Sequence, residues 1–197
     1  MEDKEIIAIK ALDYVTDNSV IGLGTGSTAN FFIKHLAKKI KNEQLNIKVV
    51  ASSTVSEIEA IRNKLNLIGI DTLETLDLYV DGADEITNNL NVLKGRGYDL
   101  VKEKMLAQSA DKFIIIADQS KRVAGIGENY PIPIEVLKST WRLSKKILDK
   151  YGKGSLRKNA AGDAYAISSA GNYIFDYSFD AMSLRDLHEK ILTTPGV

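Results

Sequence analysis

Short apolar segments alternate with segments of helical periodicity over the first 117 residues, and this alternation constrains the fold more than any other feature. The segments predicted to be strands are residues 19–23, 47–51, 76–80, a short one at 90–93, and 113–117, which we expect to be the most clearly buried. Helical patterns cover residues 3–15, 27–40, 54–65 and 98–109. Strands that alternate with helices indicate βαβ units. The predicted fold class is therefore α/β, a Rossmann-like, mostly parallel sheet with helices on both faces.

The pattern changes near residue 131. From there the predicted elements are a strand at 132–136, a helix at 139–150, strands at 155–158 and 172–177, and a helix at 183–192. This β-α-β-β-α order is the ferredoxin-like, split βαβ pattern without its last strand. We expect two domains: an α/β domain over residues 1–129 that carries the chemistry, and a small α+β lobe over residues 130–197.

Charge and composition exclude several classes of function. The 26 basic and 26 acidic side chains balance, whereas nucleic-acid and membrane-surface proteins normally carry a basic excess. Zero cysteines exclude disulfides, a thiolate metal site and a cysteine nucleophile. The acidic N-terminus does not resemble a signal peptide, and no apolar run approaches the ~18 residues of a membrane span. We therefore expect a cytoplasmic protein without nucleic-acid or membrane partners.

The motif Asp81-Gly82-Ala83-Asp84-Glu85 directly follows the predicted strand 76–80. Ligands of open α/β sheets bind beyond the carboxyl ends of the strands, so this position favours a functional site. Two neighbouring carboxylates can orient hydroxyl groups, exchange protons or bind a divalent metal. The alternative without function is an acidic surface turn. His35 and His188, the two histidines, are expected on helices remote from this motif, which leaves a metal without a histidine ligand.

Two hydroxyl-rich turns follow earlier strands. Gly24-Thr25-Gly26-Ser27-Thr28 joins a strand to a helix, where free backbone N–H groups attract an anion such as phosphate. An ordinary turn in which Ser27 caps the helix is an equally good interpretation. The spacing of glycines does not fit a dinucleotide fold. Ser52-Ser53-Thr54 could bind sugar hydroxyls or phosphate, or could simply cap the next helix.

Cations and a further acid lie downstream. Lys94-Gly95-Arg96-Gly97 places positive charge on a glycine-flanked loop, where a lysine could stabilise a developing oxyanion. The alternative is a plain basic turn. Glu103 lies between Lys102 and Lys104 in a predicted helix, a position more typical of a solvated glutamate. Lys121 follows strand 113–117 and is expected at the same edge of the sheet.

The joint order of these motifs is more specific than any one of them. The set comprises Gly24-Thr25-Gly26-Ser27-Thr28, Ser52-Ser53, Asp81-Gly82-Ala83-Asp84-Glu85, Lys94-Gly95-Arg96-Gly97, Glu103-Lys104, Ala117-Asp118 and Ser120-Lys121, with Pro131-x-Pro133-x-Glu135-Val136 and Pro195-Gly196-Val197 extending it. In this order the motifs resemble type A ribose-5-phosphate isomerase. The resemblance covers almost the whole chain.

The resemblance implies a catalytic role for four residues. Glu103 would be the base that moves a proton between C2 and C1 of an open-chain sugar phosphate. Asp81 and Asp84 would contact the sugar hydroxyls, and Lys94 would stabilise a cis-enediolate. The implied activity is interconversion of D-ribose 5-phosphate and D-ribulose 5-phosphate, in the non-oxidative branch of the pentose phosphate pathway. It needs no cofactor and no metal, and the family forms homodimers or homotetramers.

The resemblance also implies a set of substrate-binding residues: Thr25, Gly26, Ser27, Thr28, Gly82, Ala83, Gly95, Arg96, Gly97 and Lys121. Lys4 aligns with an N-terminal lysine placed near the substrate phosphate. Glu85 is expected to brace the turn that holds the two aspartates.

The chain departs from the family in two places. The loop after the catalytic lysine is nearly all glycine in the family, followed by small residues, whereas this chain has Arg96, Tyr98 and Asp99 there. Arg96 either points outward or adds a phosphate contact. The family also continues beyond Pro-Gly-Val with a strand that completes the small lobe. The main alternative function is a non-catalytic sugar-phosphate sensor, and a second is a sugar-phosphate hydrolase or deaminase, which would want a well-placed histidine.

Overall fold

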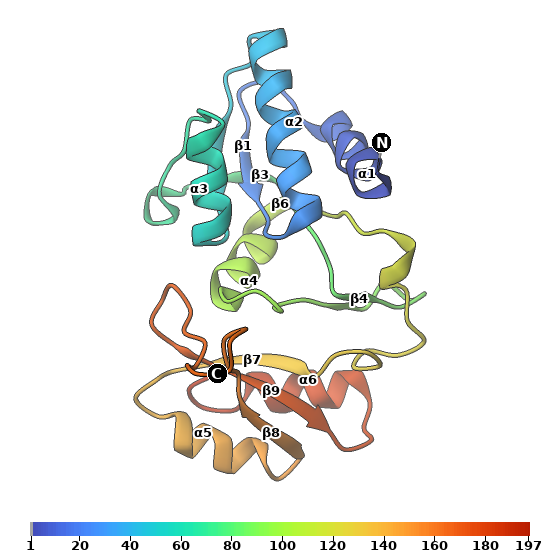
Figure 1. Ribbon diagram of the computed structural model, residues 1–197, viewed down its shortest axis with the longest axis vertical. Coiled ribbons are helices and arrows are strands. Elements are labelled where there is room, and N and C mark those ends of the chain that lie inside the picture. The colour runs from blue at the N-terminus through green and yellow to red at the C-terminus, as the bar shows by residue number, and fades with distance from the viewer. Residues whose placement is uncertain (1) are drawn as a thin grey trace. The chain divides into compact units, whose positions relative to one another are not determined.

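Four parallel strands form the sheet of the first of the two units into which the chain divides (Figure 1). The computed structural model describes residues 2–197. The first unit comprises Met1–Ala83 and Val101–Lys121, and the second comprises Asp84–Leu100 and Arg122–Val197. The segment 84–100 therefore packs with the C-terminal part of the chain. The domain boundary expected after residue 129 stays a prediction.

The first unit has the strand order β2-β1-β3-β6, and every neighbouring pair is parallel. Its strands are β1 (Val20–Leu23), β2 (Lys48–Ala51), β3 (Leu76–Asp81) and β6 (Ala110–Ile115), and its helices are α1 (Asp3–Lys10), α2 (Ser27–Glu43), α3 (Thr54–Arg62) and α4 (Leu100–Ser109). A 3₁₀ turn, Ala11–Tyr14, extends α1. This confirms the predicted α/β class.

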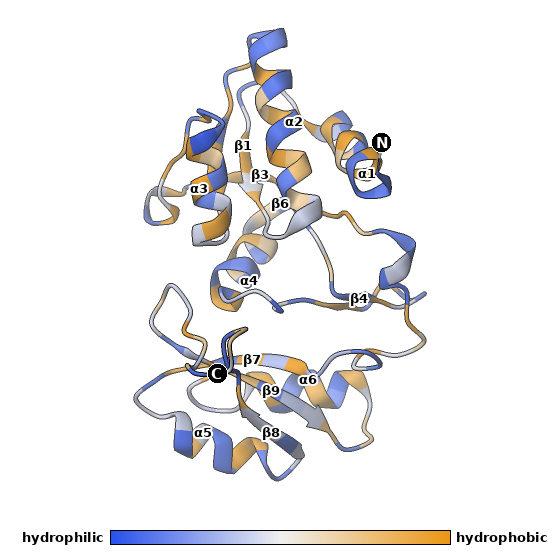
Figure 2. Ribbon diagram, viewed as in Figure 1, coloured by the Kyte–Doolittle hydropathy of each residue, from blue (hydrophilic) through white to orange (hydrophobic). Residues whose placement is uncertain are grey.

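Helices cover both faces of this sheet. On one face α2 buries Phe32, Ile33 and Leu36 in a cluster with strand residues such as Leu23 and Val80. On the other face Leu106 of α4 packs with Tyr79, Leu76 and Val50. Figure 2 shows hydrophobic and hydrophilic residues alternating along α2, as expected for a helix with one buried side. Burying a side chain such as Phe32 contributes roughly 1.5–3 kcal/mol relative to leaving it in water.

The register of the strands aligns their carboxyl ends. Leu23 lies opposite both Ala51 and Val80, and Asp81 lies opposite Ile115. The residues that follow these strands therefore emerge at one edge of the sheet. The motifs that begin at Gly24, Ser52 and Asp81 start at this edge, as the sequence predicted.

The second unit is built around an antiparallel sheet of order β7-β9-β8. Its strands are β7 (Ile132–Val136), β8 (Gly152–Leu156) and β9 (Tyr173–Phe179), with helices α5 (Trp141–Leu148) and α6 (Leu184–Leu192). A core of Ile134, Val136, Leu148, Phe175 and Tyr177 lies beneath it. Strand order and connectivity match the predicted split βαβ lobe without its last strand. The backbone N–H of Leu137 donates to the carbonyl of Gly196 at 2.8 Å, so the terminal residues lie beside the end of β7.

Several predicted elements differ in extent from those observed. Strand 90–93 shrinks to β5 (Val92–Leu93), which pairs with an unpredicted strand β4 (Glu85–Ile86). The expectation that 113–117 is the most clearly buried strand is wrong. Its residues belong mostly to β6 at the edge of the sheet, where Phe113 is 37% exposed. An apolar sequence does not reveal whether a strand is central or at an edge.

Within residues 2–197, no helix has the length and apolar character needed to span a bilayer.

Candidate active site

Asp81, the last residue of β3, is fully buried, and its carboxylate accepts hydrogen bonds from Thr25, Gly82 and Tyr79. One oxygen accepts from the backbone N–H of Thr25 at 3.0 Å and from that of Gly82 at 2.7 Å. The other accepts from the hydroxyl of Tyr79 at 2.5 Å. These donors come from two neighbouring strand ends and hold the carboxylate in one orientation. The alternative of an acidic surface turn is thus wrong for Asp81.

Gly24 allows β1 to approach this carboxylate. A Cβ atom at Gly24 would lie 2.2 Å from the nearer Asp81 oxygen and 2.5 Å from its Cα, so only glycine fits here. The hydroxyl of the next residue, Thr25, donates to Ser53 Oγ at 2.6 Å and lies 3.1 Å from Ser52 Oγ. The turns after β1 and β2 are therefore joined directly beside Asp81.

Glu103, on α4, is only 5% exposed. The interpretation as a solvated glutamate between two lysines is therefore wrong. The buried Tyr79 hydroxyl lies in the field of both Glu103 and Asp81. Burial first, and then the negative charges of Asp81 and Glu103, raise the pKa of Tyr79 far above its ordinary value. Tyr79 consequently remains a hydrogen-bond donor across any working pH.

The start of α2 combines a helix terminus with lysines. Gly26, with φ of +108°, is the N-cap and offers no side chain to the helix, so the expectation that Ser27 is the cap is wrong. The amine of Lys4 donates to Ser27 Oγ at 3.2 Å. The pKa of Asp118 is lowered first by its hydrogen bond with Ser120, and further by the positive charges of Lys4 and Lys121. Lys4 and Lys121 thus lie near the start of α2, a helix of 17 residues.

The Ser52–Thr54 turn has the simpler of its two predicted roles. Ser53 is the N-cap of α3, and its hydroxyl accepts from the backbone N–H of Ser56 at 3.2 Å. Ser56 Oγ accepts in return from the backbone N–H of Ser53 at 3.1 Å, which completes a capping box. The cap also fixes the hydroxyl that Thr25 contacts.

The second unit holds the other half of the acidic motif. Asp84 accepts a hydrogen bond from the backbone N–H of Arg96 at 3.1 Å, which ties it to the loop of Lys94. Gly95 in that loop has φ of +97°, and a Cβ there would lie 2.7 Å from Leu100 and 3.1 Å from Pro133. The loop is therefore held in one tight conformation that requires glycine.

Glu85 braces a segment far away in the sequence. It is fully buried and accepts from the backbone N–H groups of Gly127 at 2.6 Å, Asn129 at 2.6 Å and Tyr130 at 3.1 Å. These contacts position Tyr130, and the Arg96 guanidinium lies over its ring, 3.8 Å from the centroid. This cation–π contact accounts for the arginine within an otherwise glycine-rich loop.

Sequence reasoning did not identify Tyr79, Arg157 or Asp176 as contributors to these networks. Tyr79 was hidden because an aromatic residue in a strand normally indicates core packing. The other two lie in the small lobe. Arg157 contacts the 94–97 loop across about sixty residues of sequence, and Asp176 bonds to Arg157. Among residues 2–197, no group of three or more histidine, cysteine, aspartate or glutamate side chains is placed to hold a metal ion.

Comparison with known proteins agrees with this architecture. Residues 48–197 match a family described as ribose 5-phosphate isomerase A (phosphoriboisomerase A). A ribose-5-phosphate isomerase A from Prochlorococcus marinus subsp. pastoris is 38% identical, over 98% of this chain and 86% of its own length. One from Pyrococcus horikoshii is 37% identical, over 100% of this chain and 87% of its own length.

Solved structures give the same result. A D-ribose-5-phosphate isomerase in complex with phospho-erythronic acid superposes with a TM-score of 0.91 at 36% identity, covering 99% of this chain and 86% of that one. Ribose 5-phosphate isomerase A from Methanocaldococcus jannaschii gives 0.92 at 32% identity, covering 99% and 87%. Fold and relatives together define this protein as an enzyme of the isomerase class. The chain belongs to the ribose 5-phosphate isomerase A family.

Proposed function

We propose that this chain interconverts D-ribose 5-phosphate and D-ribulose 5-phosphate through a cis-enediolate, with Glu103 as the base. Glu103 would take the proton from C2 of the open-chain aldose and return it to C1 of the enediolate. The observation that carries this assignment is the burial of Glu103, which is 5% exposed although it lies between Lys102 and Lys104 in the sequence. A buried carboxylate beside a protonated tyrosine is suited to exchange a proton with carbon.

The remaining site residues take complementary roles. Asp81, fixed by three donors, would orient the sugar hydroxyls together with Asp84. Lys94 would stabilise the enediolate, an effect on the order of 3 kcal/mol if it equals one oxyanion-hole donor. The start of α2, with Lys4 and Lys121, would receive the phosphate. Thr25, Gly82, Ala83, Gly95, Arg96 and Gly97 remain substrate-binding residues in this proposal.

The proposal extends to the cellular setting. The reaction would serve the non-oxidative branch of the pentose phosphate pathway, in the cytoplasm, with the enzyme acting as a homodimer or homotetramer. The balance of acidic and basic side chains supports a small-molecule partner and not a nucleic acid.

Replacement of Glu103 by Gln tests the assignment of the base. Glu103→Gln keeps the size of the side chain but removes the proton acceptor, so we expect kcat to fall about 10²–10⁴-fold, as for loss of a general base. Formation of ribulose 5-phosphate is the measurement, and Glu57→Gln at an exposed position of α3 is the control. Undiminished turnover in Glu103→Gln would remove Glu103 from this role. Substrate binding without turnover in the wild type would instead favour a sensor.

Chelation tests whether the aspartates bind a metal. Both Asp81 oxygens already accept hydrogen bonds from N–H or O–H donors, an arrangement that suits a hydroxyl-orienting acceptor. We therefore expect turnover to be unchanged after exhaustive dialysis against EDTA. Loss of activity that Mg²⁺ or Mn²⁺ restores would identify the aspartates as metal ligands.

A further inference from the structure

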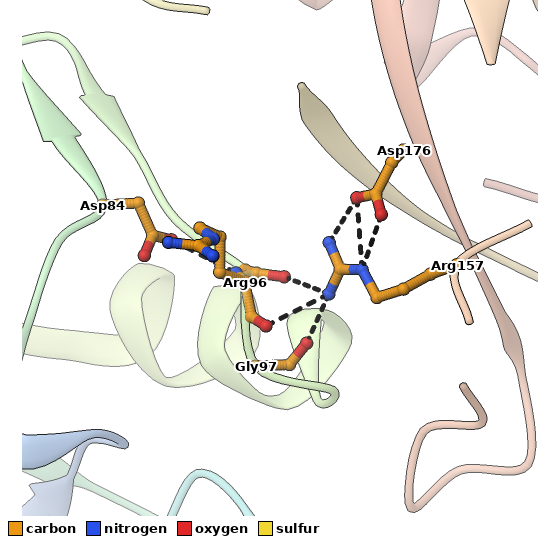
Figure 3. A network of polar contacts seen from close by, with 6 residues as sticks. Asp84, Arg96, Gly97, Arg157 and Asp176 are labelled. Atoms are coloured by element: carbon orange, nitrogen blue, oxygen red, sulfur yellow. Dashed lines mark hydrogen bonds and ion pairs between the residues drawn. The ribbon is translucent and has the colours of Figure 1, made fainter. Parts of the chain in front are cut away.

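Arg157, the residue after β8, directs its guanidinium at the loop that carries Lys94 (Figure 3). Its Nη1 donates to three consecutive carbonyl oxygens, those of Gly95 at 3.0 Å, Arg96 at 3.3 Å and Gly97 at 2.6 Å. The Arg157 side chain is only 11% exposed. Three backbone acceptors from adjacent residues meet at one cation, so the conformation of the loop and the position of Arg157 depend on each other.

Asp176 holds Arg157 from the opposite side. Its carboxylate accepts from Arg157 Nε at 3.0 and 3.1 Å and from Nη2 at 2.5 Å. Such a fork-to-fork pair fixes the plane of the guanidinium as well as its position. The backbone is equally fixed, because the N–H of Arg157 donates to Ile174 at 2.7 Å and its carbonyl accepts from Ala166 at 2.9 Å. A rigid antiparallel strand pair therefore supports the guanidinium.

The same loop holds Asp84 on its other side. Arg96 accepts from Arg157 through its carbonyl and donates to Asp84 through its N–H at 3.1 Å. Figure 3 shows the resulting series of contacts, from Asp176 through Arg157 and the backbone of the loop to Asp84. Lys94 is the residue immediately before the three carbonyls. Two proposed catalytic side chains are thus connected to one arginine of the small lobe.

We propose that Arg157, oriented by Asp176, is a positioning residue for the isomerisation. It sets the 94–97 loop so that Lys94 and Asp84 are presented in their reactive geometry. Glycine-rich backbone has many accessible conformations, and a displacement of about 1 Å in a positioned group can lower the rate about 10²-fold. The inference rests on the proposed function, specifically on the catalytic role of Lys94.

A cavity beside Arg157 provides a direct test. It has a volume of about 240 Å³ and is lined by Arg96, Tyr130, Pro131, Arg157 and Asp176. Truncation of Arg157 to alanine would enlarge this space and leave Asp176 and the three carbonyls without their cation. Free guanidinium ion fits that position chemically, because it offers the same planar donors.

The first experiment measures kcat and KM of Arg157→Ala, Arg157→Lys and Asp176→Asn, with Arg185→Ala on the exposed face of α6 as the control. We expect kcat of Arg157→Ala to fall about 10²-fold while KM changes less than about threefold. Guanidinium chloride at tens of millimolar should restore part of the lost kcat in Arg157→Ala and none in Lys94→Ala. Should Arg157→Ala not fold, Arg157→Lys and Asp176→Asn must still lower kcat more than KM. A kcat equal to that of Arg185→Ala in all three variants would overturn the proposal.

The second experiment separates this inference from the proposed function. If Arg157 acts partly through Lys94, the loss of kcat in the double variant Lys94→Ala/Arg157→Ala should be smaller than the product of the two single losses. Fully multiplicative effects, with a normal loss in Lys94→Ala, would show that Arg157 does not act through Lys94, which would overturn the positioning role and leave the proposed function intact. Normal turnover in Lys94→Ala would instead contradict the catalytic role of Lys94 itself.

Discussion

Tyr79 combines a ring that packs in the core with a hydroxyl that bonds to Asp81, a proposed catalytic residue. Its ring stacks on Phe113, with the centroids 4.9 Å apart, while its hydroxyl bonds to Asp81. It fills the space above Gly22, where a Cβ would lie 2.6 Å from the ring. The aromatic body thus anchors the strands, and the polar end orients a carboxylate of the proposed active site.

Replacement of Tyr79 by Phe tests the second of these contributions. The ring is kept but Asp81 loses its hydroxyl donor, so we expect kcat to fall about tenfold. Loss of a buried hydrogen-bond partner should also lower the free energy of unfolding by about 1–3 kcal/mol. Kinetic assays and urea unfolding at neutral pH measure the two effects. An unchanged kcat would show that the orientation of Asp81 does not depend on the tyrosine hydroxyl.

The same tyrosine makes stability depend on pH. Its pKa is raised in the folded protein, so the unfolded chain releases the proton first, from about pH 10 upward. Stability is therefore fully present below pH 10 and declines above it, by up to 1.36 kcal/mol per pH unit for one proton. Urea unfolding at pH 9 and pH 11 should show a smaller decline for Tyr79→Phe than for the wild type. Equal declines would contradict the raised pKa.

Some residue roles could be read from the sequence, and others could not. The position of Asp81 after an apolar strand correctly indicated that it lies at the carboxyl edge of the parallel sheet. Glu103 and Glu85 could not be interpreted in this way, because their burial results from packing and not from their immediate neighbours. Arg157 was equally hidden, since its partners are distant in sequence and are backbone carbonyls, which no motif reveals.

At the level of elements, the start of α2 lacks a stabilising side-chain cap at the position where we propose that the phosphate binds. A glycine N-cap leaves the first N–H groups without a side-chain acceptor, whereas α3 and α6 begin with serine caps that accept hydrogen bonds. A good cap stabilises a helix by about 1 kcal/mol. Helices α1 and α5 also lack a side-chain cap hydrogen bond, so the missing cap at α2 agrees with the proposed phosphate site without establishing it.

Replacement of Ser27 by Asp tests this interpretation. A carboxylate at the first turn should stabilise the helix by about 0.3–1 kcal/mol but repel a phosphate. We therefore expect KM to rise at least tenfold while the free energy of unfolding does not decrease. Ser183→Asp, at the N-cap of α6, is the control and should leave KM unchanged. If KM stays constant in Ser27→Asp, the phosphate is held elsewhere.

Periodicity predicted most elements well, and the failures have physical causes. Strand β7 was predicted with its observed bounds, because Ile132–Val136 is apolar and ends before a helix cap. Strand β4 has only two residues and lies within a polar motif, so no periodic signal exists for it. Strand β8 begins at Gly152, earlier than predicted. The prediction missed this start because Gly152 and Gly154 supply no apolar side chains; they make room for Phe179 and Tyr177.

For the whole molecule, the sequence predicted the two architectures but not the packing of one internal segment. The parallel sheet and the antiparallel lobe were both anticipated from the change of pattern near residue 131. The packing of segment 84–100 with the lobe was not, because it depends on contacts such as those of Glu85 with residues 127–130.

The contacts of Glu85 have a consequence for sequence variation. Glu85 holds residues 127–130 entirely through main-chain amides, so the side chains of that segment take no part in the attachment. The exposed Asn129 is accordingly open to substitution, while Gly127, with φ of +91°, is restricted by its conformation alone. Among homologues, position 129 should vary in sequence while the glutamate that anchors the segment does not. A variable surface position is thus attached to a restricted position of the interior.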